Sequence, residues 1–177
     1  MIRPSFRQSR HRLLPRLALA RRVAVVAACV TLSACAAAPN PTAPAPAPVR
    51  QITQSAHCGL TGPGLLLVTT DDQLSKYLGL KGQNLATQQL RAVDLSQEVL
   101  LFVTLGEKPT AGYGVGLAAA DLQRDNLRIR MESRTPPAGA VLAQVMTSPC
   151  AVLAVEPGRW NRVTVSGVAE APMVLQP

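Results

Sequence analysis

The segment Glu98–Leu105, EVLLFVTL, constrains this fold more than any other part of the chain. It is apolar from Val99 onward and too short for a typical helix, so that it favours a strand. Because both of its faces are apolar, the strand has to be covered on both sides. A second run of this kind, Cys150–Glu156, predicts another buried strand.

The segment 126–133 shows a different pattern, in which polar and apolar residues alternate. Leu127, Ile129 and Met131 are expected to face inward, which is typical of an antiparallel strand with one solvated face. We also expect strands at 64–70, 113–120 and 162–168, and short helices at 71–79 and 84–92. The sum predicts an α+β fold: a mainly antiparallel small sheet or sandwich-like domain, with one or two short helices near its N-terminal side.

The formal charge of +8 is concentrated at the N-terminus. Residues 1–34 contain seven arginines and no acidic residue, which leaves 11 basic against 10 acidic residues in the rest of the chain. Nucleic-acid binding is therefore not expected. A basic region followed by the apolar run Val23–Ala34 is instead typical of a secretory signal peptide.

The apolar run ends in Leu32-Ser33-Ala34-Cys35, which resembles the signal of bacterial lipoproteins. The resemblance implies cleavage before Cys35 and acylation of its thiol and its new amine. Cys29 fits the same pattern, but cleavage there would leave an apolar region below the usual length. An ordinary signal peptide that releases a soluble protein is the alternative. Residue 36 is alanine rather than aspartate, so the resemblance implies the outer membrane, facing the periplasm, with the cell surface as an alternative.

Prolines alternate with alanines after Cys35, which prevents helix or sheet formation. We therefore predict three parts: a signal peptide at 1–34, an acylated cysteine and Pro/Ala-rich tether at 35–50, and one globular domain at 51–177. The domain contains two cysteines, Cys58 and Cys150. In an oxidising compartment we expect them to form a disulfide, and two buried free thiols are the alternative.

Residues that would support catalysis are scarce beyond residue 50. His57 is the single histidine there, and it lies next to Cys58, whose thiol a disulfide would remove. No cysteine and histidine spacing typical of zinc occurs. Asp71 and Asp72 are a possible metal pair, but helix capping explains them better. We therefore expect no enzyme activity, no metal and no cofactor.

Two surface features are candidates for an interface. Arg128 and Arg130 point to one face of their expected strand, where they form either a solvated surface or a contact for an acidic partner. Trp160, the single tryptophan, is either a core residue at a turn or an interface anchor.

The segment Gly106–Leu117, GEKPTAGYGVGL, is rich in glycine, and we expect it to form the turn of a β-hairpin. Its spacing does not match the phosphate-binding Gly-x-Gly-x-x-Gly pattern. Gly114 and Gly116 leave one face of the following strand bare, so that another backbone or a partner can approach closely.

Two motifs together resemble the C-terminal domain of the PrcB family, over residues 60–157. The first motif consists of Gly106, Lys108, Pro109, Thr110, Gly112 and Tyr113, and the second of Thr147, Pro149 and the apolar run 150–155. Ala111 replaces the first glycine of the family's pair. The family is named for a lipoprotein subunit of a surface protease complex. The resemblance thus implies an envelope lipoprotein that binds or stabilises another protein, with 108–113 as the candidate interaction loop.

The hexapeptide KPTAGY, residues 108–113, also resembles a loop of chagasin-type inhibitors of cysteine proteases. Those inhibitors have an Arg-Pro-Trp loop as well, whereas this chain has Gly158-Arg159-Trp160. Protease inhibition is therefore the alternative function, and binding of a small envelope ligand or peptidoglycan is a further one.

Overall fold

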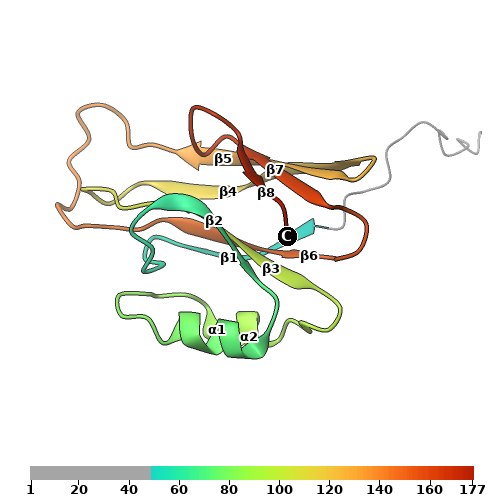
Figure 1. Ribbon diagram of the computed structural model, residues 1–177. Helices are drawn as coiled ribbons and strands as arrows, with labels where there is room; N and C mark the ends of the chain where they lie inside the picture. The colour runs from blue at the N-terminus through green and yellow to red at the C-terminus, as the bar shows by residue number, and fades with distance from the viewer. Residues whose placement is uncertain (1–48) are drawn as a thin grey trace, which may run out of the picture. The chain divides into compact units, whose positions relative to one another are not determined.

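The computed structural model describes residues 49–177, which form two sheets and a layer of two short helices (Figure 1). The expected signal peptide, Cys35 and most of the expected tether lie outside the described residues. In chain order the elements are β1 (Val49–Ser55), β2 (Pro63–Val68), α1 (Asp71–Leu78), α2 (Thr87–Arg91), β3 (Val99–Leu105), β4 (Gly114–Gln123), β5 (Asn126–Arg134), β6 (Cys150–Val155), β7 (Arg162–Ser166) and β8 (Met173–Leu175).

Each sheet has four strands. The strand order is β1-β6-β3-β2 in the first, which we call sheet 1, and β4-β5-β7-β8 in the second, which we call sheet 2. Neighbouring strands are antiparallel except β5 and β7, which are parallel. The predicted fold class, a mainly antiparallel α+β domain with short helices, is therefore confirmed at this level.

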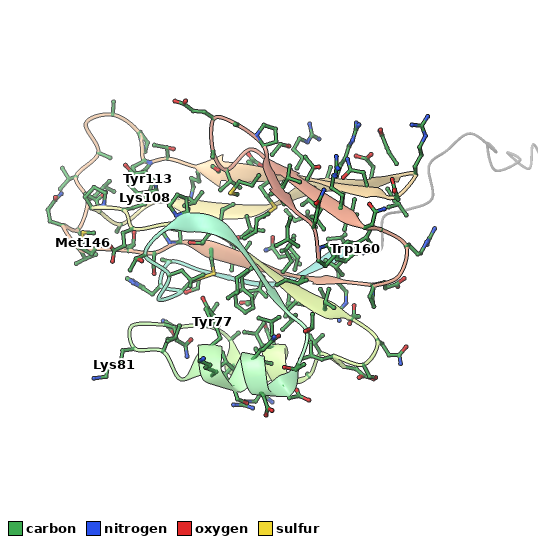
Figure 2. All side chains as sticks on the ribbon, in the orientation of Figure 1. Tyr77, Lys81, Lys108, Tyr113, Met146 and Trp160 are labelled. Atoms are coloured by element: carbon green, nitrogen blue, oxygen red, sulfur yellow. A yellow bond between two sulfur atoms is a disulfide. The ribbon has the colours of Figure 1, made fainter. Side chains whose placement is uncertain are left out.

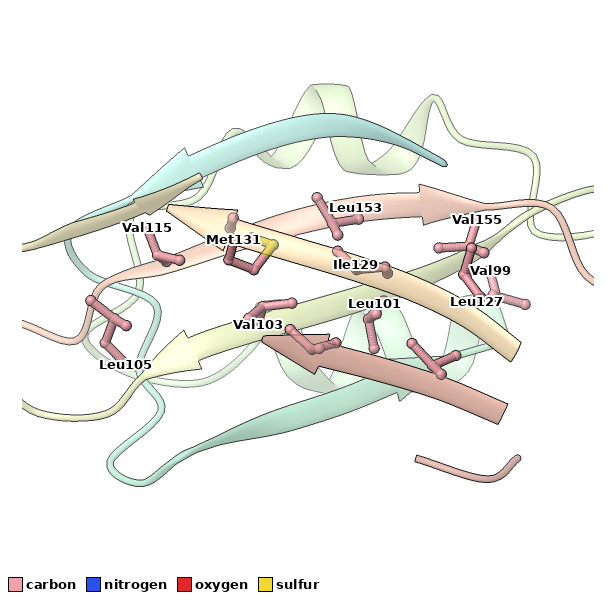
Figure 3. Close-up of a cluster of buried hydrophobic side chains, with 13 residues drawn as sticks. Val99, Leu101, Val103, Leu105, Val115, Leu127, Ile129, Met131, Leu153 and Val155 are labelled. Atoms are coloured by element: carbon pink, nitrogen blue, oxygen red, sulfur yellow. The ribbon is translucent and has the colours of Figure 1, made fainter. Parts of the chain in front are cut away.

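The central strands β3 and β6 are buried along their whole length, as their continuous apolar sequences require. Alternate side chains of these strands point toward sheet 2 and form the core between the two sheets (Figure 3). That core includes Leu101, Val103 and Leu153 from sheet 1, and Leu127, Ile129 and Met131 from sheet 2. The inward alternation predicted for 126–133 is thus present in β5.

The other face of sheet 1 is covered by the helices and by the loops next to them (Figure 1). Phe102 of β3 packs there against Tyr77 of α1, with ring centroids 4.5 Å apart. The N-cap of α1 is Thr70, whose hydroxyl accepts a hydrogen bond from the Gln73 N–H, so the expected capping role of Asp71 or Asp72 is wrong. Both aspartates lie in the first turn, where their charge is favourable to the helix dipole.

The expected disulfide between Cys58 and Cys150 is present. Both cysteines are fully buried, and their Cα atoms are 6.0 Å apart. The bond joins the segment that follows β1 to the first residue of β6. It therefore fastens the segment after β1 to a central strand of sheet 1 that is distant from it in the sequence.

Three of the edge strands have features that the sequence does not predict. β1 begins at Val49, ahead of the expected domain boundary at 51, and neither β1 nor β8 is among the strands that the sequence predicts. β4 contains a bulge between Leu117 and Ala119, which shifts its pairing with β5. As a result, the inward positions change from Leu117 to Ala120 across the bulge.

Candidate functional site

The loop 106–113 does not form a hairpin, contrary to the expectation from its glycines. It connects β3 in sheet 1 to β4 in sheet 2, so it crosses from one sheet to the other. Gly106 begins the crossing with a φ of +70°, and a Cβ atom at this position would lie 2.7 Å from the Pro63 nitrogen. Only glycine fits both the backbone conformation and the close approach of Pro63.

The loop is held by the second family-like motif, which lies beside it. Lys108 N–H donates to the Thr147 carbonyl at 2.8 Å, and Thr147 N–H donates back to the Lys108 carbonyl at 2.9 Å. The Thr147 hydroxyl donates to the Thr110 carbonyl at 3.1 Å, and Leu105 N–H donates to the Pro149 carbonyl at 2.9 Å. The two motifs are thus one structural unit, joined mainly through backbone groups. We call it the family-like unit.

The side chains of the candidate loop have separate surroundings. Tyr113 is half-buried against the core between the sheets, and Lys108 Nζ lies 5.8 Å from the centre of its ring (Figure 2). Pro109 and Gly112 are exposed, whereas Thr110 is half-buried. Gly112 has a φ of +96°, and Ala111, which replaces the other glycine of the pair, is not among the residues with positive φ.

The segment between β5 and β6 is the feature that the sequence reasoning missed. No charged residue occurs from Thr135 to Pro149, and most of 137–146 is exposed. Three of the five exposed large apolar side chains in the described part of the chain are here: Val141, Val145 and Met146. The absence of charge over the whole segment is the sequence signal that would have revealed it. We call residues 137–146 the apolar loop.

The apolar loop projects at the end of the domain that also holds the family-like unit (Figure 1). Ala111 N–H donates to the Ala143 carbonyl at 3.0 Å, and Pro136 and Leu142 lie beside Gly112. Met146 is 60 % exposed and is seen at this end together with Lys108 and Tyr113 (Figure 2). The family-like unit therefore holds the base of the apolar loop, whose side chains form an exposed apolar surface.

The other candidates lie away from this end. Arg128 and Arg130 are exposed on the outer face of β5. Trp160 is half-buried against the core between the sheets, and its indole N–H donates to the Glu156 carbonyl at 2.8 Å (Figure 2). The structure does not bring these three residues together with 108–113.

Few side chains in the part of the chain that the structure describes could take part in a chemical reaction. Cys58 is held in the disulfide next to His57, so no thiol is available there as a nucleophile. Burial raises the pKa of Tyr77, whose hydroxyl donates to the Cys58 carbonyl at 2.7 Å. Residues 49–177 contain no group of three or more side chains suited to a metal ion. They also contain no helix long and apolar enough to cross a membrane.

Comparison with known proteins gives one match. Neither the curated proteins nor the solved structures include a significant match to this chain. Residues 99–156 match the family described as PrcB C-terminal. The match runs from β3 to just beyond β6, so it includes both motifs of the unit and the apolar loop between them. The resemblance inferred from the sequence is therefore confirmed for residues 99–156, which are similar to the PrcB C-terminal family.

Proposed function

We propose that this chain is a non-catalytic, lipid-anchored envelope protein whose domain binds another protein and stabilises a complex. The observation that carries the proposal is the apolar loop. Exposed apolar patches that are larger than scattered single residues mark interaction sites. Here Val141, Val145 and Met146 share one uncharged segment at one end of the domain.

Hydrogen bonds from the neighbouring loop hold part of the apolar loop in place, which supports a role in binding. Hydrogen bonds to Lys108, Thr110 and Ala111 fix the segment at 143–147. A surface that is fixed in advance loses less conformational entropy when a partner binds. The lack of charge also favours an apolar partner surface, because no ionic group has to be desolvated.

The family match suggests which partner to examine first. PrcB C-terminal regions are named for a subunit of a protease complex, so a protease of the envelope is the first partner to test. The anchor would be acylated Cys35 at the outer membrane, on the periplasmic side. The segment 36–48 would then separate the domain from the membrane surface.

The binding proposal is tested by site-specific photo-crosslinking in the envelope. We expect a photo-reactive residue at Val141 or Met146 to give a specific crosslinked protein. Val174, which is 57 % exposed on β8, is the matched control at a site outside the loop. Equal crosslinking at Val141 and Val174, or none at Val141 in intact cells, would show that the apolar loop is not the binding surface.

The anchor is tested separately. Cys35→Ser should stop processing and leave the precursor insensitive to globomycin, because the peptidase acts only on the lipid-modified thiol. Cys29→Ser is the matched control and should be processed normally. Normal processing of the Cys35→Ser variant contradicts the lipid anchor but leaves the binding proposal intact.

A further inference from the structure

The second surface of interest is the free edge of β2, the last strand of sheet 1. The strand pairs with β3 along its whole length, Pro63–Val68, without a bulge. Among residues 49–177, the backbone of β2 forms no hydrogen bond outside this ladder. In an antiparallel ladder every second residue directs its N–H and C=O away from the paired strand. These groups of β2 therefore have no strand partner in the described part of the chain.

The other three edge strands have features that oppose pairing with a further strand. β1 contains a bulge and the charged Arg50, and β4 contains a bulge and bonds to the Gln51 side chain through its Leu117 N–H. β8 has only three residues. Bulges, charges and short lengths are the usual protection of sheet edges. β2 lacks all three, since no charged residue occurs from 58 to 70 and Pro63 takes up only its first position.

An apolar hollow of about 260 Å³ lies beside this edge, between β2 and α1. The helix α1 follows β2 in the chain and turns back beneath it (Figure 1). Leu66 and Leu67 line the hollow from β2, and Lys76 and Leu80 line it from α1 and the turn after it. Leu80 is 43 % exposed, and a Cβ atom added at Gly64 would meet nothing within 4 Å. A strand added to β2 would therefore cover apolar side chains as well as peptide groups.

The charges of α1 are divided between its two ends. Asp71 and Asp72 lie in the first turn, whereas Lys76 lies in the last turn and Lys81 follows shortly after the helix. All four are exposed, and none forms a salt bridge within residues 49–177. Two copies of α1 that run side by side in opposite directions would place the acidic end of each next to the basic end of the other. The surface beside β2 is therefore complementary in charge to itself.

Two copies of β2 that pair antiparallel have this arrangement, because the two-fold axis that relates the strands also relates the helices. We propose that two copies of this chain associate through their β2 edges, which joins their first sheets into one continuous sheet. The inference goes beyond the binding of a partner at the apolar loop and does not depend on it, since no residue of that loop lines the hollow.

The first test uses the full chain in bacterial envelopes, with a photo-reactive residue at Leu80. We expect illumination to give an adduct of twice the mass of the chain, in which mass spectrometry finds peptides of this chain alone. Val174, which is exposed on β8, is the control and should give no such adduct. No adduct at Leu80, or an adduct with a different protein, overturns the inference.

The second test reverses the charges of α1 and measures co-purification of two differently tagged full chains. Asp71→Lys/Asp72→Lys should reduce recovery of the second copy by about threefold, and so should Lys76→Glu/Lys81→Glu, because like charges then face each other. Co-expression of one double variant with the other should restore recovery. Circular dichroism shows which variants are folded, and failure of two folded variants to restore recovery overturns the inference.

Two further variants show which surface is responsible. Arg128→Glu/Arg130→Glu makes the same change of charge on the outer face of β5 and should leave recovery of the second copy unchanged. Val141→Ser should abolish capture of the partner at the apolar loop and also leave recovery of the second copy unchanged. Reduced recovery in the first variant would assign association to net charge, and reduced recovery in the second would assign it to the apolar loop. Either result overturns association through β2.

Discussion

Lys108 and Thr147 exchange both of their backbone hydrogen bonds, although they belong to different loops of the domain. The Thr147 hydroxyl adds a third bond, to the Thr110 carbonyl, and the residue is only 3 % exposed. The two motifs by which the sequence resembles the PrcB C-terminal family therefore stabilise one another. Together they hold the β3–β4 connection against the end of the β5–β6 connection.

This relationship predicts the effect of Thr147→Val, which keeps the shape of the side chain but removes its hydroxyl. The Thr110 carbonyl then loses its donor, and we expect the free energy of unfolding to fall by about 1 kcal/mol. Urea denaturation measures the change. Thr135→Val, at an exposed position of the same connection, is the control and should have little effect.

A second prediction concerns the side chains of the candidate interaction loop. Lys108 contributes to the unit through its backbone, so Lys108→Ala should cost no more than about 1 kcal/mol, the size of an exposed cation–π contact. Tyr113→Ala removes a half-buried ring from the core between the sheets and should cost about 2 kcal/mol. Recovery of the partner in pulldowns should be unchanged in Lys108→Ala. A loss of recovery would show that this side chain contacts the partner directly.

The sequence predicts the buried strands well, because their patterns are strong. The continuous apolar runs of β3 and β6 and the alternation in β5 leave little choice of structure. β1 was not predicted, since Gln51 and Gln54 interrupt its apolar pattern and a bulge lies at Ile52. β8 has only three residues, which is too short for any periodic signal.

The candidate site was predicted less completely, for reasons of tertiary structure. The glycines of 106–113 are compatible with a hairpin and with a crossing between sheets, and only the pairing of β3 with β6 decides between them. That pairing is not encoded in local sequence patterns.

The disulfide allows a third prediction. Its loop spans 92 residues, so reduction should lower the free energy of unfolding by about 4–5 kcal/mol if the effect arises from the entropy of the unfolded chain. The double variant Cys58→Ser/Cys150→Ser, compared with the oxidised protein in urea denaturation, measures this loss. A change below 1 kcal/mol would mean that the unfolded chain is already restricted without the bond.

Two glycines with positive φ provide a fourth, matched test. Gly106 and Gly139 have φ angles of +70° and +79°, but only Gly106 is crowded by Pro63. Gly139→Ala should cost about 1 kcal/mol from backbone strain alone. Gly106→Ala should cost clearly more, because the new methyl group clashes with backbone atoms. Equal thermal stability of the two variants would contradict the close approach.

The fifth prediction is a pH dependence that arises from Tyr77. Burial raises its pKa in the folded state, so the unfolded state releases the phenolic proton first as the pH rises past about 10. The stability that Tyr77 contributes is therefore complete below pH 10 and decreases above it, by up to about 1.4 kcal/mol per pH unit.

Tyr77→Phe is the control for this effect. It loses the hydrogen bond to the Cys58 carbonyl and should be less stable at neutral pH. Its stability should fall less steeply than that of the parent protein between pH 9.5 and 11 in urea denaturation. Parallel decreases in the two proteins would assign the effect to other groups.

The pairing of β1 with β6 has a consequence for how this chain folds. β1 is among the first described segments to leave the ribosome, yet its strand partner spans Cys150–Val155. Sheets that depend on such distant pairings form slowly, because a long loop must close before any contact stabilises it. Sheet 1 cannot be completed until nearly the whole chain has been synthesised. Until β6 has left the ribosome, the inner edge of β1 therefore has no strand to pair with.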